Sequence, residues 1–197
     1  MGRSNPHLIL ASSSPRRRQL LTDAGYSFEV DPSGIDEPEP FPGESASGYV
    51  ARLAWEKAFA VAQRRGSGLI LGADTTCDVE GLILTKPIDR VDAERMVRAQ
   101  EGRDIEVLTG LVLLDARRET WIGALDRSVC RFRVFTESER EAYLDSGTWE
   151  GKAGAYGVQD NDPVVTVVSG SWTNVVGLPM ERLEDVLHRF AFAHPPA

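Results

Sequence analysis

The sequence predicts a mixed α/β fold, in which an elongated sheet is flanked by helices. Apolar runs of strand length alternate with segments of helical spacing, but without the regular strand-helix rhythm of a purely parallel sheet. The chain has 197 residues, 42% of them hydrophobic and 26% charged, which is ordinary for a globular protein with a sizeable core. Because no linker-like stretch divides the chain, we expect one domain over residues 1–197.

The strands are expected where short apolar runs are bounded by turn residues. These runs cover residues 7–11, 26–31, 68–73, 76–85, 104–115, 120–135 and 163–168. Within the fourth run, Glu80-Gly81 separates 76–79 from 82–85, which predicts a tight hairpin.

The helices are expected from capping residues and apolar spacing. The first begins with Ser14 as N-cap and Pro15 at the first helical position, and it ends before Gly25. The others are expected at about 45–65, 92–101 and 136–147, and from residue 179 onward. Thr136-Glu137-Ser138-Glu139 has the pattern of a capping box.

The totals argue against several classes of protein. A formal net charge of −8 disfavours nucleic acid as a partner. No apolar run approaches the roughly 18 residues of a membrane span, and the N-terminus lacks a signal-peptide pattern, so we expect no membrane association and a cytoplasmic protein. Cys77 and Cys130 are expected in the core. The three histidines are scattered, which argues against a histidine-based site.

The stretch ASSSPRRRQLL, residues 11–21, places three arginines at a helix start, where positive charge opposes the helix dipole. A bound anion would offset that cost, since serine hydroxyls, free backbone N–H groups and guanidinium groups together hold phosphate. A solvated basic face on a capped helix explains the same residues equally well.

Acidic residues form the second candidate feature. Asp74 follows the apolar run LILGA and is expected at the end of a buried strand, where a carboxylate needs a partner. Asp36 and Glu37 could join it around a hard cation such as Mg²⁺. The alternatives are an acid that caps a turn and a solvated acidic loop.

Three further stretches carry polar groups of less specific meaning. Lys86 ends the strand-like LILTK before a proline, and Lys152 lies in the glycine-rich GKAGAYGVQ, residues 151–159, which matches no P-loop. Residues 169–179, SGSWTNVVGLP, form a turn-rich entry to the last helix.

The order of these motifs is more specific than any one of them. LILASSSPRRRQLL, IDE, ARLAWEKA, GADT, TKP, GKAGAYGVQ and GSWTNVVGLP together resemble the Maf family of nucleoside triphosphate pyrophosphatases, from about residue 8 to 190. The resemblance implies an α/β fold with two lobes around a cleft, similar to the inosine triphosphate pyrophosphatases. It also implies hydrolysis of a nucleoside triphosphate to the monophosphate and pyrophosphate with a divalent cation, Mg²⁺ or Mn²⁺.

The resemblance also assigns roles to residues. Asp74 of GADT matches the catalytic base, Glu37 matches an acid that acts through the metal, and Lys86 of TKP matches an essential lysine, which we place on the phosphates. Asp74 and Glu37 are thus the expected metal ligands. Burial should raise the pKa of Asp74, whereas the cation and Lys86 should lower it, leaving it ionised with metal bound.

Substrate binding is expected from Ser12, Ser14, Arg16, Arg17, Thr75, Lys152 and Gln159. Three of these, Arg16, Thr75 and Gln159, match the dTTP/UTP type of the family, whereas the 7-methyl-GTP type tends to carry Trp, Gln and Glu there. The family's usual Gly directly after the glutamine is absent here, which bears on base selection. A 7-methyl-GTP or other modified-nucleotide pyrophosphatase is the alternative enzyme, and a non-catalytic nucleotide-binding regulator of cell division is the alternative of another class. The sequence leaves a homodimer open.

Overall fold

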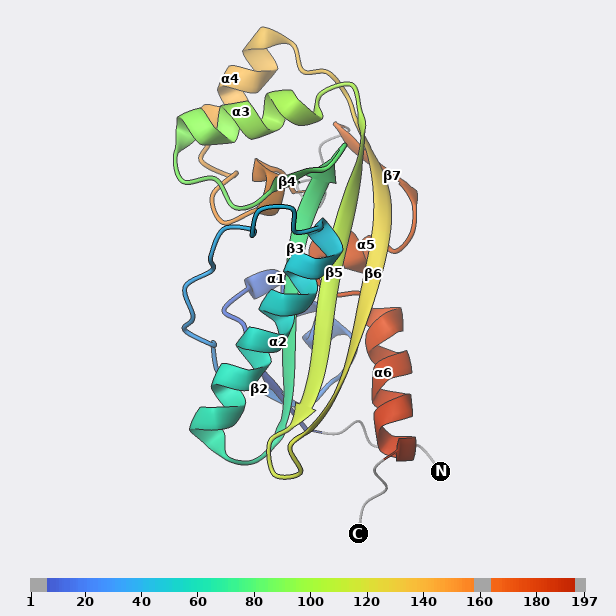
Figure 1. Ribbon diagram of the computed structural model, residues 1–197. Coiled ribbons are helices and arrows are strands. Elements are labelled where there is room, and N and C mark those ends of the chain that lie inside the picture. Colours follow the sequence, from blue (N-terminus) through green and yellow to red (C-terminus); the bar gives the residue numbers. More distant parts are fainter. Residues whose placement is uncertain (1–6, 158–163, 194–197) are drawn as a thin grey trace.

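A computed structural model describes residues 7–157 and 164–193 and shows a seven-stranded mixed sheet (Figure 1). Six strands follow the order β2-β1-β3-β5-β6-β7, and β4 pairs with β3 off this path. Strands β2, β1 and β3 are parallel, while β3, β5, β6 and β7 are antiparallel. The strands are β1 (Leu8–Leu10), β2 (Phe28–Val30), β3 (Leu69–Val79), β4 (Leu82–Leu84), β5 (Asp104–Asp115), β6 (Thr120–Phe132) and β7 (Val165–Ser169). The mixed α/β class expected from the sequence is confirmed.

Helices flank both faces of the sheet, with α2 on one face and α6 on the other (Figure 1). The helices are α1 (Pro15–Asp23), α2 (Ala46–Arg65), α3 (Arg90–Gln100), α4 (Glu137–Asp145), α5 (Trp172–Val176) and α6 (Met180–Ala193), with a short 3₁₀ turn, η1 (Ala153–Ala155). Among the described residues, no helix is both long and apolar enough to cross a membrane.

The helix starts follow the capping residues. The Ser14 side chain accepts from the backbone N–H of Arg17, as expected for the N-cap of α1. Thr136 and Glu139 form both bonds of the predicted capping box at α4.

Two of the hydrophobic clusters lie toward opposite ends of the long strands and so define two lobes. One core packs the end of β3 and the start of β5 against α3 and α4, around residues such as Met96, Phe132 and Leu144. The other packs the opposite ends of the same strands against β1, α1 and α6, around Leu10, Leu113 and others. Strands β3, β5 and β6 pass through both lobes (Figure 1), so side chains at their middle lie between the two cores. Both cysteines are buried in the first core, as expected.

Strand β3 differs from its prediction, and the difference concerns the site. The sequence suggested that a strand ends before Asp74, yet β3 continues without a break to Val79 and places Asp74 at its middle. The polar residues there resemble a strand end, but pairing with β5 holds them in the strand, with Asp74 opposite Gly110. Three smaller differences are that β6 ends at Phe132, that β7 begins at Val165 and that residues 172–176 form a short helix rather than only turns.

Helix α2 lies directly on the backbone of the sheet. A Cβ atom built on Gly72 would come within 2.2 Å of the Ala54 carbonyl oxygen, and one on Gly110 within 2.5 Å of the Val50 carbonyl oxygen. Neither distance is possible for a real side chain, so glycine at these two strand positions permits the close approach of helix and strands.

Candidate active site

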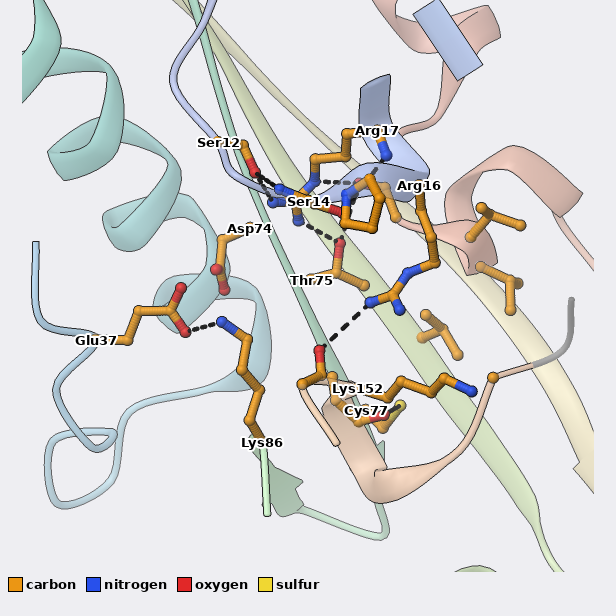
Figure 2. A pocket seen from close by; sticks show the side chains of 18 of the residues that line it. Ser12, Ser14, Arg16, Arg17, Glu37, Asp74, Thr75, Cys77, Lys86 and Lys152 are labelled. Carbon is orange, nitrogen blue, oxygen red and sulfur yellow. Dashed lines mark hydrogen bonds and ion pairs between the residues drawn. The ribbon is translucent and has the colours of Figure 1, made fainter. Parts of the chain in front are cut away.

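A cavity of about 510 Å³ lies between the two lobes and brings together most of the residues expected to bind substrate (Figure 2). Its lining includes Ser12, Ser14, Arg16, Arg17, Glu37, Asp74, Thr75, Lys86 and Lys152. These residues come from the β1–α1 junction, the loop after β2, the middle of β3, the end of β4 and the segment before η1. Gln159 lies outside the described residues.

The cavity lies at a gap in the edge of the sheet. Strand β1 pairs with β3 over residues 69–71, and β4 pairs with it over 77–79, on the edge away from β5. Between them, residues 72–76 have no strand partner on this edge within the described part of the chain. Asp74 and Thr75 are consecutive and face opposite sides of the sheet, yet both line the cavity because it extends around this open edge.

Two carboxylates and two lysines alternate along one side of the cavity. Lys57 Nζ donates to Asp74 Oδ1 at 2.5 Å and to Glu37 Oε1 at 2.7 Å. Lys86 Nζ donates to Glu37 Oε2 at 2.6 Å, as Figure 2 shows. Lys57 and Asp74 are each only 5% exposed, so this pair is excluded from bulk water. Asp74 Oδ2 accepts no hydrogen bond from a described residue and remains available for a water molecule or a cation.

Lys57 is not among the site residues predicted from the sequence, although its helical spacing indicates that it is buried. It follows Leu53 by four residues and Ala54 by three, which places it on the buried face of α2. A lysine on such a face must be paired with an acid, because burial of an unpaired charge is costly.

The charges around Glu37 hold it in the ionised form. Burial alone would raise its pKa, but the nearby ammonium groups of Lys57 and Lys86 outweigh burial and lower the pKa of Glu37 to about 2. The carboxylate is therefore negatively charged throughout the neutral range.

Asp74 shows the opposite balance. Burial raises the pKa of Asp74 above its ordinary value, and in this structure it outweighs the lowering effects of Lys57 and Arg17. The side-chain charges that lower the pKa of Asp74 are those of Lys57 and Arg17. Lys86, which the sequence suggests for this effect beside a bound metal, donates to Glu37 instead. The raised pKa makes the ionised Asp74 carboxylate a stronger base than that of an exposed aspartate.

Arg17 joins three parts of the site. Its guanidinium donates from Nε to the Gly177 carbonyl oxygen at 2.8 Å, from Nη1 to Ser12 Oγ at 3.1 Å and from Nη2 to Thr75 Oγ1 at 3.1 Å. The side chain is 8% exposed. Arg17 therefore ties the start of α1 to β3 and to the turn after α5, while its charge acts on the cavity.

Arg16 and Lys152 lie across the cavity from the acids (Figure 2). Arg16 Nη2 donates to the Gly151 carbonyl oxygen at 3.5 Å, which brings the start of α1 close to the segment before η1. A polyanion in this cavity would meet Arg16 and Lys152 on one side and Lys86 on the other.

The donor set is compatible with a hard divalent cation. Mg²⁺ is commonly bound by one or two carboxylates, with substrate phosphates and water completing its six ligands. Glu37 and Asp74 provide two carboxylates, both bonded to Lys57, and Asp74 Oδ2 is open. The described residues contain no cluster of three or more His, Cys, Asp or Glu side chains suited to a metal, so such a cation would depend on phosphate oxygens from the substrate.

Comparison with known proteins identifies the same family as the sequence motifs. The Maf-like protein family matches residues 7–190. A dTTP/UTP pyrophosphatase of Rhodopirellula baltica is 45% identical, covering 96% of this chain and 85% of that protein. A dTTP/UTP pyrophosphatase of Pelotomaculum thermopropionicum is 40% identical, covering 94% of this chain and 97% of that protein. The chain belongs to the Maf-like family, and the resemblance expected from the sequence is confirmed.

Among solved structures, one similar chain is a nucleoside-triphosphatase, a dITP/XTP pyrophosphatase, of Mycobacterium abscessus. It is 15% identical, with a TM-score of 0.46, covering 95% of this chain and 93% of that chain.

Proposed function

We propose that this protein is a pyrophosphatase that hydrolyses dTTP and UTP to the monophosphate and pyrophosphate. The observation that carries the proposal is the alternation of Asp74, Lys57, Glu37 and Lys86 along one side of a cavity whose other side holds Arg16 and Lys152. Cations on both sides suit a triphosphate, and a buried carboxylate with an open oxygen suits activation of water. The names of the 40–45% identical relatives support the same activity.

In this proposal Asp74 Oδ2 accepts a proton from the water that attacks the α-phosphorus. Lys57 keeps the Asp74 carboxylate oriented through Oδ1, so the open oxygen faces the cavity. Lys86, Arg16 and Lys152 bind phosphate oxygens, and the serines at the start of α1, Ser12 and Ser14, offer hydroxyl groups to them.

We further propose that Mg²⁺ or Mn²⁺ is bound by Glu37 and Asp74 together with the substrate phosphates. Such a cation supplies charge neutralisation on the phosphates when bound. Glu37 is suited to this role because its carboxylate stays ionised at neutral pH. We place the enzyme in the cytoplasm, acting on free nucleotides.

We expect release of pyrophosphate, not orthophosphate, from dTTP and UTP in the presence of Mg²⁺ or Mn²⁺, and loss of turnover in excess EDTA. The measurement is product analysis by phosphorus NMR, with turnover followed before and after EDTA and again after the metal is restored. Orthophosphate as the first product, or undiminished turnover in EDTA, would refute the proposal.

Arg16→Trp should change base preference more than stability, because Arg16 lies half-buried on the cavity wall at the start of α1. We expect the ratio of kcat/KM for UTP to that for 7-methyl-GTP to fall, with little change in melting temperature. Arg18→Trp is the matched control, since Arg18 is exposed on the same helix and does not line the cavity. An unchanged ratio in Arg16→Trp would remove Arg16 from the specificity residues.

A further inference from the structure

The cavity continues past the acids into an apolar chamber on the opposite face of the sheet. The chamber lies on the side of β3 to which Thr75 and Cys77 point, whereas Asp74 points to the α2 side. The apolar residues that line the cavity on this side are Cys77, Ile105, Val107, Phe132, Val165 and Val175. A charged phosphate has no partner among these apolar side chains, but a flat heterocyclic base would bury apolar area there.

Gln100 brings an amide group into this apolar chamber. It is the last residue of α3, lines the cavity and is only 1% exposed. A Cβ atom built on Gly154 would lie 3.1 Å from Gln100 Oε1 and 3.0 Å from Cys77 Sγ. The Gln100 oxygen and the Cys77 side chain therefore lie close to the same side of Gly154.

The orientation of this amide is fixed by its partners. Gln100 Nε2 donates to the Met96 carbonyl oxygen at 3.0 Å and to the Gly154 carbonyl oxygen at 2.6 Å. Both partners are acceptors, so the atom between them must be the NH₂ group. Gln100 Oε1 is therefore the remaining atom, and no described residue donates a hydrogen bond to it.

A buried acceptor in apolar surroundings selects a ligand that brings a donor. Leaving such an oxygen without a partner costs free energy, and a ligand N–H recovers it. Uracil and thymine carry one N–H group in the ring at N3, and the rest of each ring is flat and can pack against apolar walls.

We propose that Gln100 Oε1 accepts a hydrogen bond from the N3–H of the uracil or thymine ring and so acts as a base-specificity residue. This inference rests on the proposed dTTP/UTP pyrophosphatase function, which it deepens by naming a side chain that reads the base. The Gln100 amide makes the reading stringent, because its two bonds to backbone carbonyls prevent it from turning its NH₂ group toward the ligand.

The test compares UTP with 3-methyl-UTP, which lacks the N3–H. We expect the wild-type enzyme to favour UTP in kcat/KM by roughly ten- to a hundredfold, the range for an unsatisfied buried acceptor. Gln100→Met keeps the length of the side chain and removes the acceptor, so kcat/KM for UTP should fall while that for 3-methyl-UTP changes little. The ratio between the two substrates should thus approach one.

Met96→Leu is the matched control, since Met96 is buried one turn earlier on the same helix and offers no acceptor side chain. It should leave the ratio near the wild-type value. Equal use of UTP and 3-methyl-UTP by the wild type would overturn the inference even if Gln100→Met failed to fold. So would an unchanged ratio in a folded Gln100→Met. A wild-type enzyme that releases pyrophosphate from neither UTP nor dTTP would instead refute the proposed function.

Discussion

Asp74→Asn should reduce turnover of dTTP by roughly 10²–10⁴-fold, the contribution that general base catalysis typically makes. The amide keeps the shape of the carboxylate and can still accept from Lys57 through Oδ1, but its other end cannot take a proton from water. Binding of the nucleotide should persist, because Glu37, Lys86, Arg16 and Lys152 are unchanged.

The measurement pairs steady-state turnover with calorimetric binding of a non-hydrolysable dTTP analogue. Asp78→Asn is the matched control, since Asp78 lies on the same strand but outside the cavity, where it accepts from the backbone of Gly81. Turnover near that of the wild type in Asp74→Asn would refute the role of base. If binding is lost together with turnover, Asp74 acts chiefly as a metal ligand.

Lys57→Met should lower the free energy of unfolding by about 3–5 kcal/mol at neutral pH, the cost of removing one partner from a buried ion pair. Methionine fills a similar volume, so the loss arises from the uncompensated Asp74 carboxylate rather than from a cavity. Both side chains are nearly fully buried, which keeps water from screening the lost interaction.

The loss of unfolding free energy in Lys57→Met should depend on pH in a defined direction. Burial already raises the pKa of Asp74, and without Lys57 one of the two opposing charges is gone, so the pKa rises further. The folded variant then binds this proton more tightly than the unfolded chain, and its stability falls as pH rises through the folded-state pKa. Its stability deficit relative to the wild type should therefore be smaller in acid and larger at neutral pH.

Urea unfolding at several pH values measures this dependence. Lys86→Met is the matched control, because Lys86 contacts the same Glu37 but its side chain is 51% exposed, so its loss should cost no more than about 1 kcal/mol. Equal losses of stability in the two variants would contradict this prediction. So would a loss in Lys57→Met that does not change with pH, because it would show that the mutation does not leave Asp74 as an uncompensated buried charge.

Residues whose signal is local could be predicted from the sequence. Ser14 caps α1 as expected, because serine is favoured at the N-cap and proline at the first position of a helix. The motif order identified the family, and with it Asp74, Glu37 and Lys86, which the structure brings into one cavity. The single-domain organisation and a homodimer stay predictions.

Features that depend on contacts distant in the sequence could not be predicted. Asp74 resembles the end of a strand, and only the pairing of β3 with β5 and the gap between β1 and β4 show it as the middle of a strand with an open edge. Lys57 meets Glu37 across 20 residues and Asp74 across 17. Gln100 approaches Gly154 across 54 residues, which no spacing rule covers.

The direct contact between α2 and the sheet has a consequence for chemistry. Lys57 lies in the turn of α2 between Ala54 and Ala58, and both alanines rest on Gly72, two residues before Asp74 on the same strand. No layer of side chains lies between helix and strand here, and side chains are what usually absorb small shifts in packing. The distance between the α2 backbone at Lys57 and the strand that carries Asp74 is therefore set by contact of main chain with main chain. Gly72 and Gly110 do not line the cavity, yet they determine how closely α2, and with it Lys57, approaches the strand that carries Asp74.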